Sequence, residues 1–207
     1  MNEQQESVVQ EKKESKWQKI VLSIVVVFLA VFTVLILLYS ILFYHVTVVG
    51  SSMSPTLKNG DVLLVSKHYK VERGDIVIVK DETASGNLLI KRAVALGGDT
   101  VTIMDGYLFI NGKKQIEEYL LVQGETFYPD VTNRNDTKAQ TWQVKEGQVF
   151  YLGDNRKNSN DSRYEEYGTC SLEQIDGVVK DWVLNFKGIS KGISNFISGV
   201  RKIFTFN

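Results

Sequence analysis

A serine and a lysine in separate apolar segments are the residues of this 207-residue chain best suited to nucleophilic chemistry. Ser52 follows the apolar segment 46–49, at a turn where a serine more often bonds nearby backbone than reacts. A serine hydroxyl becomes a good nucleophile only when a neighbouring base takes its proton. Lys91 can supply that base, because burial disfavours the charged amine and lowers its pKa.

The surroundings of Lys91 follow from the two-residue period of a strand. Residues 88–96 are aliphatic apart from two cations, and they predict a strand. Alternation places Leu89, Ala93 and Ala95 on the Lys91 face, while the opposite face carries Ile90, Arg92, Val94 and Leu96. The alternative is a lysine whose amine reaches solvent at a strand edge. The apolar face favours a desolvated lysine that acts as a base when neutral.

Composition excludes several other chemistries. His45 adjoins a long apolar run and His68 lies in the charged segment 66–70, so both are expected at the surface. A Ser/Lys pair needs neither histidine. Cys170 has no second cysteine for a disulfide, and no Cys/His cluster has metal-ligand spacing, so neither a metal nor a cofactor is predicted. Positive and negative charges balance at 24 each without a basic stripe, and nucleic acid is therefore not an expected partner.

A polar segment, residues 153–163, follows the apolar segment 149–152. It can be a plain surface loop. Three of its residues, Ser159, Asp161 and Arg163, are donor and acceptor types that can instead orient a base and compensate its charge. The segment is therefore a candidate third part of a catalytic site.

Residues 20–43 form an uncharged apolar run that can cross a membrane as a helix, since about 20 residues span the hydrocarbon core. A cleaved signal peptide has a shorter apolar region that ends at small residues, unlike this run. Four lysines precede the run and one follows it over a comparable length. This bias predicts a single-pass protein of the cell membrane, with residues 1–19 as a polar cytoplasmic tail. Residues 1–15 are expected to be unordered.

Short β-branched segments separated by turn residues predict a mainly β, extracytoplasmic domain over residues 44–184. A polar insertion is expected at about residues 105–148, and its most polar part, residues 123–146, should lie at the rim rather than in the core. Apolar residues recur at helical spacing over residues 185–207, beside lysines and arginines. That pattern favours an amphipathic helix on lipid over a final strand with an unordered tail. The expected strands are residues 61–65, 75–79, 88–96, 100–103, 107–110 and 149–152.

Four motifs after the apolar run resemble the conserved boxes of type I signal peptidases, in that family's order. They are Ser52-Met53-x-Pro55-Thr56-Leu57, Arg73-Gly74-Asp75-Ile76-Val77, Lys91-Arg92-Ala93-Val94 with Gly98-Asp99, and Gly153-Asp154-Asn155-Arg156 with Ser159-x-Asp161-Ser162-Arg163. The resemblance covers about residues 46–183 and is closest in form to the Gram-positive branch. It implies a membrane-anchored serine endopeptidase, built from coiled antiparallel sheets, that removes signal peptides from exported preproteins with a Ser/Lys dyad.

The resemblance also implies roles for individual residues. Ser52 is the nucleophile, Lys91 the general base, and Ser159 the hydroxyl that holds the lysine amine in position. The Ser52 backbone N–H receives the oxyanion, whereas Gly50 offers only backbone where some relatives have a hydroxyl. Supporting roles are expected for Asp161 and Arg163 in the loop and for an ion pair of Arg92 with Asp154.

Substrate binding is expected by strand addition, because an extended peptide can pair with exposed strand edges. The edges considered are residues 46–50 and 88–90. The resemblance implies small residues at the first and third positions before the cleaved bond, held in shallow pockets. The expected substrate-binding residues are Val48, Gly50, Met53, Leu57, Leu89 and Ile90.

The expected partners are signal peptides of preproteins and membrane lipid, with a monomeric chain close to the secretion translocase. The alternative is a non-catalytic, signal-peptidase-like accessory of pilus assembly or secretion, which would keep the motifs and lose the dyad. Both Ser52 and Lys91 are present. A self-cleaving repressor-type Ser/Lys protease would carry a DNA-binding domain in place of the apolar run. A single-pass binding module is the alternative outside enzymes.

Overall fold

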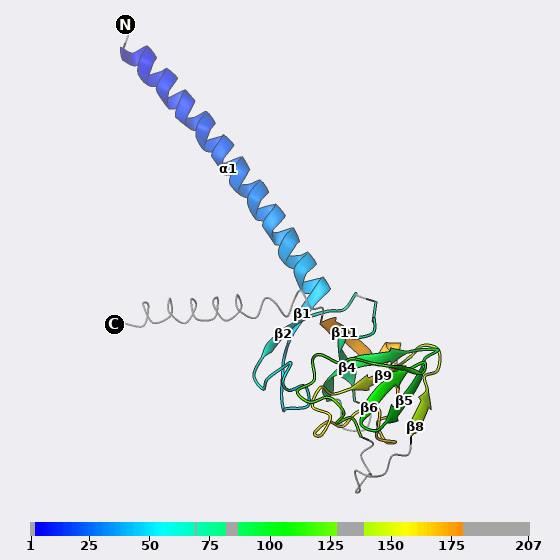
Figure 1. Cartoon of the computed structure of the whole chain (residues 1–207). Helices are drawn as coiled ribbons and strands as arrows, with labels where there is room; N and C mark the ends of the chain where they lie inside the picture. The colour runs from blue at the N-terminus through cyan, green and yellow to red at the C-terminus, as the bar shows by residue number, and fades with distance from the viewer. Residues whose placement is uncertain (1–2, 69, 82–86, 128–138, 180–207) are drawn as a thin grey trace, which may run out of the picture. The chain divides into compact units, whose positions relative to one another are not determined.

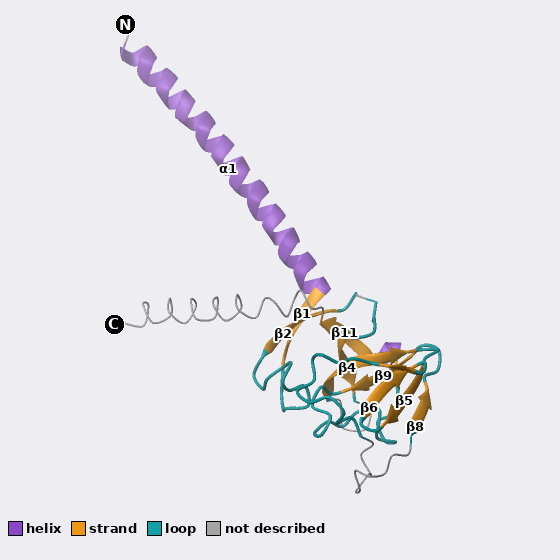
Figure 2. Cartoon of the chain, viewed as in Figure 1, coloured by secondary structure: helices purple, strands orange, loops and turns teal. Residues whose placement is uncertain are grey.

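The structure is a computed structural model that describes residues 3–68, 70–81, 87–127 and 139–179 (Figure 1). The chain divides into an N-terminal unit, residues 1–43, and a second unit, residues 44–207. Figure 2 shows that the first is helical and that the described part of the second, here called the β-domain, consists of strands and loops with a short helix. The amphipathic helix predicted for residues 185–207 lies outside the described residues.

The N-terminal unit is a single helix, α1, Glu3–Leu42. Its part Lys16–Leu42 is long and apolar enough to cross a membrane, since it measures about 40 Å by the rise of an α-helix. Ser23 and Thr33 donate their hydroxyls to backbone carbonyls four residues earlier, at 2.9 and 2.8 Å. These bonds satisfy the polar groups of the helix within itself, as an apolar surrounding requires.

The unordered tail expected over residues 1–15 differs from the structure, in which α1 begins at Glu3. Glu, Gln and Lys are good helix formers, and extending an existing helix needs no new nucleus. The polar tail and the apolar run therefore form one helix. The run was predicted to reach residue 43, but Phe43 already begins a strand.

A seven-stranded sheet with the order β1-β2-β11-β3-β4-β9-β10 is the larger layer of the β-domain (Figure 1). The pairs β2 with β11, β11 with β3, β3 with β4, β4 with β9 and β9 with β10 are antiparallel. A short 3₁₀ helix, Leu172–Gln174, connects β10 to β11 in the chain. The strands are β1 Phe43–Thr47, β2 Val62–Ser66, β3 Ile76–Lys80, β4 Leu88–Leu96, β9 Gln148–Leu152, β10 Cys170–Ser171 and β11 Ile175–Val179.

A four-stranded sheet with the order β7-β6-β5-β8 is the second layer. Asp105-Gly106 and Asn111-Gly112 connect its first three strands, and all four residues have positive φ, between 51° and 77°. Two consecutive residues with positive φ suit a tight hairpin whose twist matches that of the strands. The strands are β5 Thr100–Met104, β6 Tyr107–Ile110, β7 Lys113–Lys114 and β8 Gln140–Gln143.

Buried apolar side chains gather in three clusters. One joins the two sheets, with Val94 and Leu152 packed against Leu108 of β6. A second contains Met53 and Leu57, which follow Ser52 and pack with residues of β2 and β3. A third covers the other face of β3, β4 and β9. The core thereby anchors the segment that follows Ser52, because two of its side chains are fully buried.

All six predicted strands exist, and their bounds agree within one residue at each end. The rim position predicted for residues 123–146 is wrong for their last part, because β8 pairs within a sheet and Val144 lies in the core; residues 128–138 lie outside the described residues. Three of the four residues of β8 are polar, since one of its faces stays exposed, at Thr141 and Gln143. With Trp142 as its only apolar residue, the segment did not read as a strand in the sequence.

Strand β4 does not keep a two-residue period to its end. Its pairing with β9 shifts register between Ala93 and Ala95, which marks a β-bulge. Beyond the bulge, Ala95 joins the cluster between the sheets, and Leu96 packs on the opposite face with Ala93. The faces predicted for Ala95 and Leu96 are therefore wrong. Leu89 and Ala93 share a cluster as predicted, and Lys91 lies between them along the strand.

Candidate active site

The backbone of Gly153, directly after β9, is where the predicted catalytic segments meet. The antiparallel register of β4 and β9, continued by one residue, sets Lys91 opposite Gly153. A Cβ on Gly153 would lie 2.2 Å from Ser159 Oγ and 2.6 Å from the Ser52 carbonyl oxygen. Both distances are shorter than atoms can approach, so only a glycine lets these segments close on one another.

The segment around Ser52 is tied to the 153–163 loop by hydrogen bonds. The backbone N–H of Asn155 donates to the Ser52 carbonyl at 2.9 Å, and its side-chain amide donates to the Ser51 carbonyl at 3.1 Å. The amide of Asn158 donates to the Ser51 hydroxyl at 3.0 Å. With Met53 buried beneath, these bonds fix the backbone on both sides of Ser52, whose side chain stays partly exposed.

Lys91 is a buried lysine, only 3% exposed. Burial lowers its pKa from 10.5 to about 8; the carboxylates of Asp161 and Asp81 oppose this change, and the guanidinium of Arg163 adds to it. A lysine with a pKa near 8 is partly neutral close to physiological pH, and the neutral amine can accept a proton. The structure thus contains the desolvated lysine that the strand pattern predicted.

Ser159 is buried, and its Oγ is the single buried side-chain oxygen or nitrogen in the described part of the chain without a hydrogen-bond partner. In particular, no hydrogen bond joins it to Lys91. Leaving such a group unsatisfied costs about 1 to 3 kcal/mol. Native structures keep few such groups, and many of them have a functional reason.

Asp161 and Arg163, which the sequence predicts as supporting residues, form an ion pair within the loop. The carboxylate of Asp161 accepts two hydrogen bonds from the Arg163 guanidinium, at 2.7 and 2.9 Å, and one from the Gly153 N–H at 3.1 Å. All of these groups are buried. Because charge-assisted, bidentate pairs are the strongest class of hydrogen bond, they hold Gly153 and the loop in one geometry.

Arg92 forms the ion pair with Asp154 that the sequence suggested. Its guanidinium donates to both carboxylate oxygens, at 2.8 and 2.7 Å, and both side chains are nearly inaccessible to solvent. The hydroxyl of Thr56 donates to the same carboxylate at 2.5 Å, and Arg92 also donates to the carbonyl of Gly74 at 2.7 Å. The pair therefore joins β4, the segment after Ser52 and the loop after β9.

Several named proteins are similar to this chain in sequence. A family described as signal peptidase, peptidase S26, matches residues 17–183. The chain is 37% identical over 158 residues to signal peptidase I U of Bacillus subtilis, which covers 73% of this chain and 80% of that protein. The chain belongs to this signal peptidase family. Signal peptidase I activity and serine-peptidase chemistry follow from that membership.

A second Bacillus member agrees with the Gram-positive resemblance of this signal peptidase. Signal peptidase I of Bacillus licheniformis is 34% identical over 193 residues, covering 87% of this chain and 95% of that protein. A solved signal peptidase I from Enterococcus faecalis is 29% identical and covers 54% of this chain and 98% of that chain, with a TM-score of 0.42. The apolar helix α1 is consistent with the single-pass membrane anchor of a signal peptidase.

The apolar residues predicted to bind substrate divide between two clusters on opposite faces of the sheet. Val48, Met53 and Leu57 are at most 3% exposed and pack in one core cluster, against which Ile90 is partly buried. Leu89 lies with the cluster on the opposite face of the sheet. Alternation along β4 places Leu89 and Ile90 on opposite faces of the sheet, so the two side chains belong to different pockets if both bind substrate.

A second set of residues, which the sequence did not single out, supports the loop from its other side. Arg156 is buried and pairs with Glu117 at 2.9 and 2.6 Å, while its Nε donates to the Gly153 carbonyl at 3.0 Å. The ring of Tyr119 lies 3.8 Å from the Arg92 guanidinium, and its hydroxyl donates to Glu117 at 2.6 Å. Because Arg156 belongs to a family motif, the sequence indicated that this arginine has a role, but it did not identify Glu117 as its partner.

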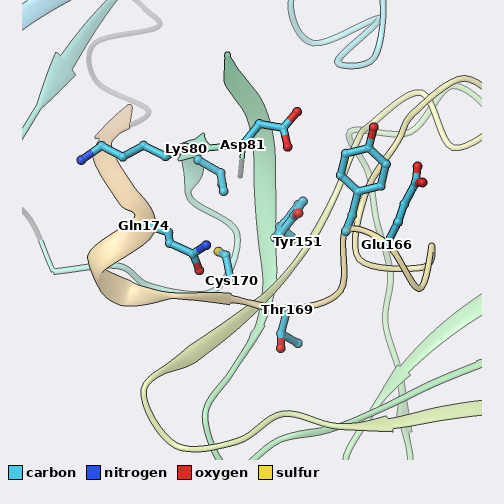
Figure 3. A pocket seen from close by; sticks show the side chains of 9 residues that line it. Lys80, Asp81, Tyr151, Glu166, Thr169, Cys170 and Gln174 are labelled. Atoms are coloured by element: carbon cyan, nitrogen blue, oxygen red, sulfur yellow. The ribbon is translucent and has the colours of Figure 1, made fainter. Parts of the chain in front are cut away.

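A cavity of about 330 Å³ opens on the sheet face that carries Leu89 and Ala93 (Figure 3). Figure 3 shows Asp81, Tyr151 and Cys170 among its lining residues. Burial raises the pKa of the Cys170 thiol to about 12 and raises that of the Tyr151 phenol as well. Both groups stay protonated near neutral pH, which makes each of them a poor nucleophile.

Proposed function

We propose that Ser52 and Lys91 form the dyad with which this signal peptidase cleaves signal peptides from preproteins. The observation that carries the proposal is the convergence of Ser52, Ser159 and the Lys91 position on Gly153. Neutral Lys91 takes the proton of the Ser52 hydroxyl while its oxygen attacks the carbonyl carbon of the bond to be cleaved. The protonated amine then gives that proton to the departing amine of the mature protein. Water activated by the neutral lysine hydrolyses the remaining ester.

Ser159 supports this mechanism as the hydroxyl that orients the lysine amine. Its buried oxygen has no partner among the described residues and lies against Gly153. Contact with the Lys91 amine would satisfy that oxygen and hold the nitrogen lone pair toward Ser52. Asp161 and Arg163 keep the loop in place for this contact.

In this proposal the Ser52 backbone N–H donates a hydrogen bond to the oxyanion of the tetrahedral intermediate. The N–H of Gly50 donates to Asn59 Oδ1 at 2.9 Å. Gly50 is therefore a turn residue with φ of 90°, whose amide is already engaged. Its place among the substrate-binding residues rests on backbone shape alone.

The substrates we propose are preproteins with small residues at the first and third positions before the cleaved bond. Strand β4 supports their binding by strand addition, because residues 88–90 pair with β3 on one edge while β9 pairs only from Arg92 onward. An extended peptide that continues the line of β9 can therefore pair with residues 88–90 and reach Lys91. Leu88 at this edge is exposed, and Leu89 and Ile90 are half-buried.

Replacing either member of the dyad tests the proposal. In the full chain in detergent, Ser52→Ala and Lys91→Met should each lower cleavage of a preprotein by about 10⁴-fold or more, as losses of a catalytic group do. Lys80→Met is the matched control, since Lys80 is a half-exposed lysine on the neighbouring strand that pairs with Asp176. Unchanged circular dichroism would show that the fold is kept. Full activity in either dyad variant would contradict the mechanism.

A further inference from the structure

We infer that residues 115–127, here called the arm, bind the mature part of the preprotein that follows the cleaved bond. The inference rests on the proposed dyad, because it assigns the chain downstream of the bond that Ser52 attacks. The arm forms one wall of a groove of about 220 Å³, and residues 154–157 form the other. Ser54, two residues after Ser52, also lines this groove.

The arm is fixed to the β-domain by buried contacts. Glu117, 4% exposed, pairs with Arg156, as described above. The N–H of Thr126 donates to the Gly106 carbonyl at 2.9 Å. A Cβ on Gly106 would lie 2.0 Å from the Gly124 carbonyl oxygen, so the two backbones are in direct contact. The arm therefore presents its remaining side chains in a defined position.

Those remaining side chains include large apolar groups in water. Leu121 is 77% exposed and Val122 is 52% exposed, and both line the groove together with Leu120. Ile116 is 84% exposed and does not line it. Apolar surface that is exposed to water is unfavourable, and a partner that covers it lowers the free energy of the complex. Leu121 and Val122 thus mark a binding surface, and Ile116 offers a comparison outside it.

The position of the groove identifies the polypeptide substrate as the occupant. The opposite wall includes Asn155, the residue whose N–H and amide hold the carbonyls of Ser52 and Ser51. A protease must accommodate chain on both sides of the bond it cuts. The edge of β4 at residues 88–90, which β9 does not cover, supplies the signal-peptide side. The groove lies beside Ser52 on the loop side, because Ser54 and Asn155 line it and the Asn155 N–H donates to the Ser52 carbonyl.

The walls of the groove suit an extended chain. Leu120, Leu121 and Val122 offer apolar contacts to side chains, and Asn155 gives the opposite wall a polar side chain. The ion pair of Glu125 with Lys157, at 2.6 Å, joins the two walls. We therefore expect a preference for an apolar residue within the first few positions after the cleaved bond.

Peptides of different length test the inference. Both carry the same signal-peptide side, but one ends with a single residue after the cleaved bond and the other continues for five residues that include leucine. For the full chain in detergent, Leu121→Ser with Val122→Ser should raise KM for the long peptide about tenfold, roughly 1.4 kcal/mol of binding. The kcat for that peptide and all constants for the short peptide should not change. Ile116→Ser is the matched control and should leave both peptides unaffected.

Other outcomes overturn the inference in distinguishable ways. An equal loss for both peptides would make the arm a support of catalysis, and no loss for either would leave the groove without substrate. A loss that appears in phosphatidylglycerol vesicles but not in detergent would assign the apolar side chains to lipid. Cleavage of the short peptide by Ser52→Ala would instead refute the proposed dyad, independently of the arm.

Discussion

Lys91 couples chemistry to stability at the scale of a single residue. Its pKa falls from 10.5 to about 8 on folding, mainly through burial. Between these pH values the unfolded lysine holds a proton that the folded one lacks, so the free energy of unfolding rises with pH through this window. Below pH 8 both states are protonated, and the buried charge costs the fold about 3 kcal/mol. The burial that would let Lys91 act as the proposed base therefore lowers the stability of the folded chain.

Two pH-dependent measurements follow from this residue. The kcat/KM of the wild type should rise with pH, with a midpoint near the Lys91 pKa of about 8, as the neutral amine forms. Lys91→Met should be inactive, yet its free energy of unfolding at pH 7 should exceed that of the wild type by about 3 kcal/mol. Urea unfolding at pH 7 and pH 10.5 checks the second, because the difference should shrink at the higher pH.

A flat activity profile between pH 6 and pH 9 would remove Lys91 as the base. If the Lys91→Met chain is less stable than the wild type at pH 7, burial of the charged lysine does not destabilise the fold. Lys80→Met again serves as the control, since that half-exposed lysine should change stability little.

Strand β4 places the two cations of the site, Lys91 and Arg92, on opposite faces of the sheet. Consecutive residues of a strand point to opposite faces, so Lys91 lies on the face that carries Leu89 and Ala93, while Arg92 reaches Asp154 from the other face. The sequence predicted both bounds of β4 and this alternation. It did not predict the bulge after Ala93, because a bulge depends on the pairing with β9 and leaves no period in the strand itself.

The ion pair behind β4 gives a prediction at the scale of elements. Asp154→Asn keeps the shape of the side chain but leaves the buried Arg92 guanidinium without its counter-charge. Breaking such a pair from one side typically destabilises a fold by about 3 to 5 kcal/mol. We expect the free energy of unfolding, measured in urea, to fall by that amount. Cleavage should fall by more than the loss of folded protein explains, because Thr56, in the segment after Ser52, also loses a hydrogen-bond acceptor.

The half-exposed pair of Glu125 with Lys157 provides the comparison, and Glu125→Gln should cost less than about 1 kcal/mol. Equal effects of the two substitutions would mean that burial does not govern these pairs.

At the scale of the whole molecule, one apolar helix and one β-domain divide the work of anchoring and cleavage. The lysines before the apolar run predict that the N-terminus stays in the cytoplasm. We therefore expect the β-domain to be extracytoplasmic. Protease added to intact spheroplasts should digest the β-domain and leave a membrane-protected N-terminal fragment.

Replacing Lys12, Lys13, Lys16 and Lys19 with glutamine should lower the digested fraction, because the charge bias that orients the span is removed. Protection of the β-domain in the unmodified chain would reverse the proposed topology. The anchor itself is not in question in that test, since Lys16–Leu42 keeps its apolar length in both chains.

The sequence by itself determined the features that have a local cause. The apolar run is long enough to span, the β-branched segments between turn residues became strands, and the period of β4 put Lys91 on a buried face. The family motifs supplied Ser52, Ser159 and the loop residues, and the structure brings their segments to Gly153.

Only the tertiary structure decided what depends on residues far apart in the chain. The partner of Arg156 is Glu117, 39 positions earlier, and no local pattern connects them. The polar β8 became part of a sheet because β5 pairs with it, and Gly153 became the centre of the site because two distant segments close on its missing side chain. Such pairings follow from packing of the whole domain, which a single sequence does not encode locally.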